Sequence, residues 1–169
     1  AKEGAGVLFA ASWPAGEGGR DIALSLESGL ARALERGEFE LHFQPLVDAT
    51  SGRAIAGEAL LRWNSAALGR RSPAEFIPLL ERSGLIVPVG DWVLQEACRQ
   101  AAAWGDVRVA VNLSARQFMG GDLVDSVTRA LALSGLAPER LELEITESLM
   151  MQSPERAVRL LTDLKRTGV

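Results

Sequence analysis

Four segments of the chain alternate between polar and aliphatic residues, and this alternation constrains the fold more than any other feature. The segments are 39–45, 54–63, 107–114 and 141–146. A period of two is typical of β-strands, because successive side chains point to opposite faces. One parity is aliphatic, and the other carries the polar side chains of Glu40, His42, Gln44, Glu58, Arg62, Asn112, Ser114, Glu142, Glu144 and Thr146. The sequence therefore predicts a sheet with one covered face and one polar face.

Helical patterns separate most of these strands. Apolar residues recur every three or four positions, which predicts helices over 21–34, 73–83, 90–104, 123–133 and 153–166. Ser72 and Glu75 form a capping-box pattern with Pro73 at the first helical position. Strands that alternate with helices indicate a parallel α/β fold, whereas the short turn over 48–53 indicates that the first two strands are antiparallel.

The polar parity decides between two α/β architectures. A flat, doubly wound sheet is covered on both faces and should be apolar on both. A barrel has helices outside and a lumen inside, so it explains one polar face. A full barrel takes roughly 250 residues. For 169 residues we predict a TIM-like (β/α) barrel with an antiparallel first strand, truncated after the fourth strand–helix unit. Such a fragment should expose a strand edge, so we expect it to aggregate, swap strands or belong to a longer chain.

Composition excludes some classes of function. The chain has 22 acidic and 18 basic residues, for a net charge of −4, which argues against binding to DNA or RNA polymers. The single cysteine, Cys98, cannot form an internal disulfide and suits a reducing compartment. We therefore expect a cytoplasmic chain, with any membrane attachment made by regions outside it. Residues 1–20 are predicted to be a linker, and 21–169 the folded unit.

Three polar residues near the carboxyl ends of successive strands form the candidate site. Glu58, Asn112 and Glu144 share the polar parity, and active sites of α/β barrels lie at that end of the strands. Two carboxylates and an amide oxygen are hard ligands, suited to Mg²⁺, Mn²⁺ or Ca²⁺ rather than to zinc. Arg62, roughly 13 Å farther along the strand from Glu58, suits a phosphate oxygen. Gln44 on the neighbouring strand is available to hydrogen-bond a ligand.

Each candidate also has a structural interpretation. Glu58 can form an internal ion pair with Arg62, Asn112 can cap a loop, and Glu144 can be a solvated residue at a strand end. Convergence on one face of successive strands argues against three independent structural roles.

Other polar residues have competing interpretations as well. His42, the only histidine, is either a general base or a satisfied core residue low in the barrel, and we favour the core residue. Arg70 and Arg71 lie near the expected mouth. They are either phosphate ligands or part of a solvated loop, and we favour the loop.

Five sequence blocks, in order, resemble the EAL family of bacterial cyclic di-GMP phosphodiesterases. Residues 57–63 read Gly-Glu-Ala-Leu-Leu-Arg-Trp and carry the Glu-Ala-Leu signature. The other blocks are Phe-Gln-Pro-Leu-Val-Asp over 43–48, Ser-Pro-Ala-Glu-Phe-Ile-Pro over 72–78, Val-Asn-Leu-Ser-Ala-Arg-Gln over 111–117 and Glu-Leu-Glu-Ile-Thr-Glu-Ser over 142–148. The short signature occurs often by chance, whereas the ordered set is specific. The resemblance runs from about Leu26 to Val169. Residues 1–10 are more weakly similar to the tail of a GGDEF (diguanylate cyclase) domain.

The resemblance implies the hydrolysis of cyclic di-GMP (c-di-GMP) to linear pGpG by two-metal catalysis, in second-messenger signalling. Glu58, Asn112 and Glu144 match metal-binding positions, and Glu58 is also catalytic. Glu147 matches an acid that positions a loop near the site. The implied ions are Mg²⁺ or Mn²⁺, and Ca²⁺, which is larger and more loosely coordinated, is expected to inhibit. Three further residues match substrate-binding positions, namely Gln44, Leu60 and Arg62.

The 169 residues lack the family's later motifs, which are two adjacent aspartates followed by Phe-Gly and a later lysine, glutamate and glutamine. We therefore expect this chain alone to be inactive, and the intact domain to be a homodimeric enzyme that binds c-di-GMP, with a GGDEF or sensor domain upstream.

The alternatives are an inactive EAL domain that serves as a c-di-GMP receptor, a protein-interaction module contacting partners through Met150 and Met151, and an unrelated Mg²⁺ barrel enzyme. The presence of the four motif residues favours the phosphodiesterase; they are Glu58, Asn112, Glu144 and Glu147.

Overall fold

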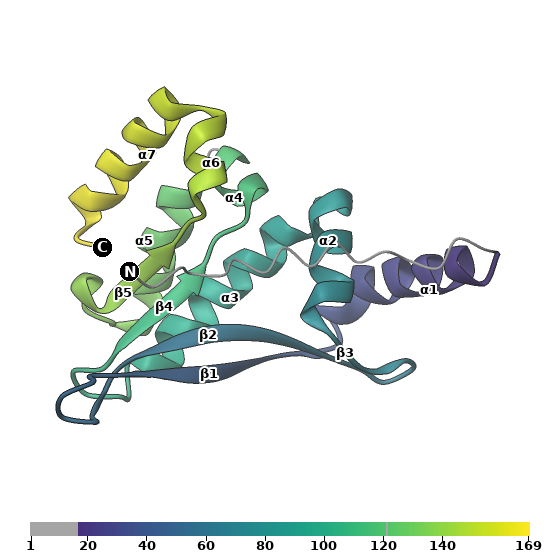
Figure 1. Cartoon of the computed structure of the whole chain (residues 1–169), viewed down its shortest axis with the longest axis horizontal. Coiled ribbons are helices and arrows are strands. Elements are labelled where there is room, and N and C mark those ends of the chain that lie inside the picture. Colours follow the sequence, from purple (N-terminus) through teal and green to yellow (C-terminus); the bar gives the residue numbers. More distant parts are fainter. Residues whose placement is uncertain (1–16, 121) are drawn as a thin grey trace.

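The computed structural model describes residues 17–120 and 122–169 (Figure 1). The predicted GGDEF tail over 1–10 lies outside the described residues. The strands are β1 (Phe39–Val47), β2 (Ala54–Ser65), β3 (Gly69–Arg71), β4 (Arg108–Asn112) and β5 (Leu141–Glu144). The helices are α1 (Glu17–Ala33), α2 (Pro73–Ser83), α3 (Ile86–Ala101), α4 (Ala115–Gly120), α5 (Leu123–Ser134), the 3-10 turn η1 (Pro138–Arg140), α6 (Glu147–Gln152) and α7 (Pro154–Thr167).

The strands form one mixed sheet in the order β1-β2-β4-β5, with β3 paired to β2. β1 and β2 are antiparallel, whereas β2, β4 and β5 run parallel to one another. The predicted α/β fold with an antiparallel first strand is therefore confirmed. Among the described residues β1 and β5 form the two edges, so these strands make an open sheet.

The aliphatic parity of the strands faces the helices, as predicted. α3 contacts β1, β2 and β4, and α5 packs against α3 on the same side of the sheet (Figure 1). The buried core on this side joins strand residues to the inner faces of both helices. It includes Leu41, Ala59, Val109, Val111, Leu141, Val93, Leu94, Ala97, Val127 and Ala130. Helices therefore cover one face and leave the polar parity free to form a site.

Several element boundaries differ from the sequence prediction. α1 begins at Glu17, inside the predicted linker, rather than at Asp21. α3 covers 86–101 instead of 90–104, because Ile86 and Val89 are buried and extend its apolar stripe toward the N-terminus. The short elements β3, α4, η1 and α6 were not predicted.

Other local predictions are confirmed. The Ser72 backbone N–H donates to the Glu75 carboxylate at 2.8 Å, which completes the capping box of α2, and Pro73 is its first residue. Among residues 17–120 and 122–169, no helix combines the length and the apolar composition needed to cross a membrane.

Candidate metal and phosphate site

The register of the parallel strands brings the three predicted metal ligands together. Asn112 on β4 and Glu144 on β5 are direct neighbours across the sheet. Glu58 on β2 lies opposite Ala110, two residues before Asn112 on the same face of β4. The Asn112 side-chain amide donates a 2.7 Å hydrogen bond to Glu58 Oε1. Three side chains from three strands therefore meet at one place on the open face.

The carboxylates at this place carry like charges that repel one another. Glu144 is exposed at the end of β5, as its interpretation as a solvated residue expected, but partial burial of its carboxylate raises its pKa, and the nearby negative charges of Glu58 and Glu142 raise it further. Glu142 has a partner of its own, since it forms an ion pair with Arg108 on β4. A cation beside Glu58 and Glu144 would relieve the repulsion between them.

Two structural interpretations are not supported. Within the described part of the chain, Glu58 and Arg62 form no ion pair; the Arg62 guanidinium instead donates to the backbone carbonyl of Leu61 at 3.1 Å. Asn112 bonds to Glu58 rather than capping a loop. The Arg62 side chain therefore has no carboxylate partner within the described residues and remains available to an anion.

The predicted substrate-contacting residues lie on the same face of the β1–β2 hairpin. Gln44 is exposed and is the direct cross-strand partner of Glu58, while Leu60 and Arg62 follow Glu58 along β2 at intervals of two residues. The order Glu58, Leu60, Arg62 therefore runs from the carboxylate cluster toward the end of β2.

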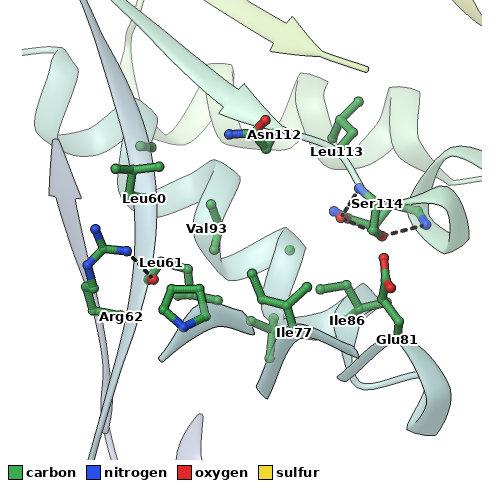
Figure 2. A pocket seen from close by; sticks show the side chains of 15 residues that line it. Leu60, Leu61, Arg62, Ile77, Glu81, Ile86, Val93, Asn112, Leu113 and Ser114 are labelled. Carbon is green, nitrogen blue, oxygen red and sulfur yellow. Dashed lines mark hydrogen bonds between the residues drawn. The ribbon is translucent and has the colours of Figure 1, made fainter. Parts of the chain in front are cut away.

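A cavity of about 300 Å³ opens where β2 separates from β4. The pairing of these strands ends at Ala59 and Val111, and beyond that point the two strands separate. Figure 2 shows Leu60 and Arg62 on one side of the gap and Asn112 and Ser114 on the other. The deeper lining is mainly aliphatic and comes from α2 and α3, including Ile77, Ile86 and Val93. The site thus combines an apolar slot with polar groups at its rim.

The expectation that His42 is a core residue low in the barrel is wrong. His42 is exposed, and its Nε2 lies 2.9 Å from Glu40 Oε1 and 3.5 Å from Arg70 Nη2. Because β1 is antiparallel to β2, its first residues lie near the carboxyl end of β2, where His42 pairs with Leu60. Arg70 also lies 3.7 Å from Glu40, so the loop interpretation misses this contact.

Within the part of the chain that the structure describes, Arg71 and Glu147 make no hydrogen bond or ion pair to the candidate metal ligands. Arg71 lies in β3 rather than in a loop, and its guanidinium donates to the carbonyl of Leu68 in the turn before this strand at 2.9 Å. Glu147 is the exposed first residue of α6. Within residues 17–120 and 122–169, its carboxylate makes no hydrogen bond or ion pair to Glu58, Asn112 or Glu144, and its loop-positioning role stays a prediction.

The chemistry of the donor set fits a hard divalent cation. Two carboxylates and one amide oxygen are suitable ligands for Mg²⁺ or Mn²⁺, which also keep water or phosphate oxygens in their coordination shells. The described residues contain no cluster of three or more histidine, cysteine, aspartate or glutamate side chains that could hold a metal. Glu58, Asn112 and Glu144 supply two carboxylates and one amide, so their fit to a cation depends on the chemistry of these oxygen donors.

Comparisons with known proteins identify the family and the fold of this chain. The model of the EAL domain family matches residues 27–169. The bifunctional diguanylate cyclase/cyclic di-GMP phosphodiesterase MucR of Pseudomonas aeruginosa is 46% identical over 151 residues, which cover 86% of this chain and 22% of MucR. The cyclic di-GMP phosphodiesterase NbdA of the same species is 39% identical over 151 residues, covering 86% of this chain and 19% of NbdA.

A solved structure of one of these relatives has a similar fold. The PaMucR phosphodiesterase in complex with c-di-GMP superposes with a TM-score of 0.82 at 46% identity, covering 86% of this chain and 61% of that one. The chain belongs to the EAL domain family. It spans about a fifth of the length of the two curated relatives named above, 22% of MucR and 19% of NbdA.

Proposed function

We propose that this chain forms part of a cyclic di-GMP phosphodiesterase site that hydrolyses c-di-GMP to linear pGpG. The observation that carries the proposal is the meeting of Glu58, Asn112 and Glu144 on the open face of β2, β4 and β5. Membership of the EAL family supports the substrate, since MucR and NbdA are phosphodiesterases for c-di-GMP.

In this proposal the polar residues divide into two groups. Glu58, Asn112 and Glu144 hold Mg²⁺ or Mn²⁺, which when bound supplies Lewis-acid stabilisation of charge on a phosphodiester. Arg62 and Gln44 bind the dinucleotide, because a guanidinium suits phosphate oxygens and an amide can both donate and accept. Leu60 gives an apolar contact between them. Ca²⁺ is proposed to inhibit, and Glu147 to position a neighbouring loop.

Other parts of the proposal concern the whole protein. We propose that its EAL domain lies in the cytoplasm, that the protein dimerises, and that a GGDEF or sensor domain precedes the EAL domain. The multidomain relative MucR, which combines diguanylate cyclase and phosphodiesterase activities, supports the last point.

The test measures c-di-GMP binding and pGpG formation with Mg²⁺, by the 169-residue chain and by the whole protein in which these residues occur. We expect both to bind c-di-GMP and the whole protein to form pGpG. Binding without pGpG formation by the whole protein would favour the receptor alternative. Absence of c-di-GMP binding by the whole protein would refute the proposed function.

A further inference from the structure

Gln117 on α4 makes reciprocal hydrogen bonds with Ser114, two residues after Asn112. The Gln117 side-chain oxygen accepts from the Ser114 backbone N–H at 3.2 Å and from the Ser114 hydroxyl at 3.0 Å. The backbone N–H of Gln117 donates in turn to Ser114 Oγ at 3.3 Å. Dashed lines in Figure 2 mark these contacts beside Ser114. Gln117 is only 7% exposed, so water competes poorly for these bonds.

The Gln117 amide packs directly against Gly90, where a larger residue would force the amide to move. A Cβ atom at Gly90 would lie 1.9 Å from Gln117 Nε2 and 2.4 Å from its Cδ. Gly90 lies within α3, where glycine is less favourable than alanine by about 1 kcal/mol. Its φ angle is not in the left-handed region, so space rather than backbone conformation accounts for the glycine. Gly90 thus weakens α3 but leaves the space that the Gln117 side-chain amide occupies.

The segment held in this way is the one that carries Asn112 into the site. The backbone N–H of Leu113 donates to the carbonyl of Glu144 at 2.9 Å, which joins the end of β4 to the end of β5. Asn112 itself bonds to Glu58. The segment 112–114 is therefore fixed by β2 and β5 on one side and by Gln117 on the other.

We propose that Gln117, seated against Gly90, is a positioning residue that holds Asn112 in the geometry needed for cation binding. This inference rests on the metal-binding role proposed above. Gln117 acts through Ser114 and contacts neither the cation nor the substrate. Residues that orient metal ligands from outside the coordination shell typically contribute about 10- to 100-fold to metal affinity.

The experiment compares four variants of the chain. Gln117→Met keeps the length of the side chain but removes the acceptor, and Gly90→Ala drives a methyl group into the amide. Ser114→Ala removes only the hydroxyl and serves as a milder variant if the first two fail to fold. Gly120→Ala is the matched control, because a Cβ atom at this α4 glycine would meet open space.

Two readouts are used on each folded variant. Hydrogen exchange of the Ser114 amide reports on the positioning contact without metal, and paramagnetic broadening by Mn²⁺ reports on cation affinity. Gln117→Met and Gly90→Ala should speed exchange at Ser114 and weaken Mn²⁺ binding by about tenfold. Ser114→Ala should have a smaller effect in the same direction, and Gly120→Ala should have none.

The outcomes separate this inference from the proposed function. Unchanged Ser114 exchange in Gln117→Met and Gly90→Ala would overturn the positioning role, as would faster exchange with unchanged Mn²⁺ affinity. Failure of the unmodified chain to bind Mn²⁺ would count against both the metal-binding role and the role of Gln117 in it. Failure to bind c-di-GMP with normal Mn²⁺ binding would count against the proposed function alone.

Discussion

Asn112 and Glu58, which are 54 positions apart in sequence, are joined by a 2.7 Å hydrogen bond from the asparagine amide to the carboxylate. This bond engages the NH₂ group of Asn112 and leaves its carbonyl oxygen as the group that can face a cation. It also connects β2 to β4 at the end of their backbone pairing, since Asn112 follows the last paired residue of β4. Asn112 also lines the cavity between the two strands, so the contact lies beside that cavity.

Replacing Glu58 by glutamine should lower the pKa of Glu144. The substitution removes one of the negative charges that raise this pKa, while the oxygen that accepts from Asn112 is kept. The measurement is an NMR titration of the Glu144 side-chain carboxyl carbon. Glu96→Gln is the control, because Glu96 lies on α3 and pairs with Arg99. An unchanged Glu144 pKa in Glu58→Gln would contradict the proximity of the two carboxylates.

Replacing Glu144 by glutamine should stabilise the metal-free fold near neutral pH. A carboxyl group whose folded-state pKa is raised costs stability as the pH rises from its unfolded pKa through its folded one. The variant should therefore unfold at higher urea than the unmodified chain above this window, and the difference should vanish below about pH 4. Glu155→Gln, at a side chain 91% exposed on α7, measures the effect of an ordinary substitution. A stability difference that is equal at low and neutral pH would exclude this explanation.

Removing the Arg62 guanidinium should weaken c-di-GMP binding. Arg62→Ala is expected to raise the Kd by about 10- to 100-fold, because hydrogen bonds to charged groups contribute about 1.5–3 kcal/mol. Isothermal titration of c-di-GMP into the protein measures this change. Arg159→Ala, on the exposed face of α7, should leave the Kd unaltered. Equal affinity in both variants would remove Arg62 from the proposed substrate contacts.

Trp63→Phe should destabilise the fold through a buried hydrogen bond. The Trp63 indole is fully buried and donates to Glu38 Oε2 at 3.0 Å, and Glu38 is itself only 8% exposed. Loss of the donor and of side-chain volume should cost about 2–4 kcal/mol. Urea unfolding measures the cost. Trp92→Phe is the matched control, since Trp92 packs at the core surface and its indole N–H donates to no described residue. A cost no larger than that of the control would argue against the role of Glu38.

Alternation and helical periodicity were sufficient to predict the larger elements. The strands of 39–45 and 54–63 and the open polar face follow from the period of the residues, which local sequence reports directly. β3 has three residues, and α4 and α6 have six each, so none contains enough turns or alternations to give a periodic signal.

The site could be predicted only in part, for a related reason. Parity places Glu58, Asn112 and Glu144 on one face, but the register that brings Asn112 to Glu58 depends on pairing between distant segments. The error at His42 also concerns pairing between strands, because its height in the sheet depends on its position opposite Leu60, near the carboxyl end of β2. The contact of the Gln117 side chain with Gly90 depends on the packing of α3 on α4. No sequence pattern indicates this contact.

The antiparallel direction of β1 has a practical consequence for studying this protein. Its connection to β2, residues 48–53, lies at the end of β2 opposite to Arg62, and Asp48 closes it by accepting from the Ser51 backbone at 2.7 Å and the Ser51 hydroxyl at 2.8 Å. A fluorophore or epitope tag attached at the exposed Thr50 would report on ligand binding from a distance without touching the groups proposed to bind the ligand.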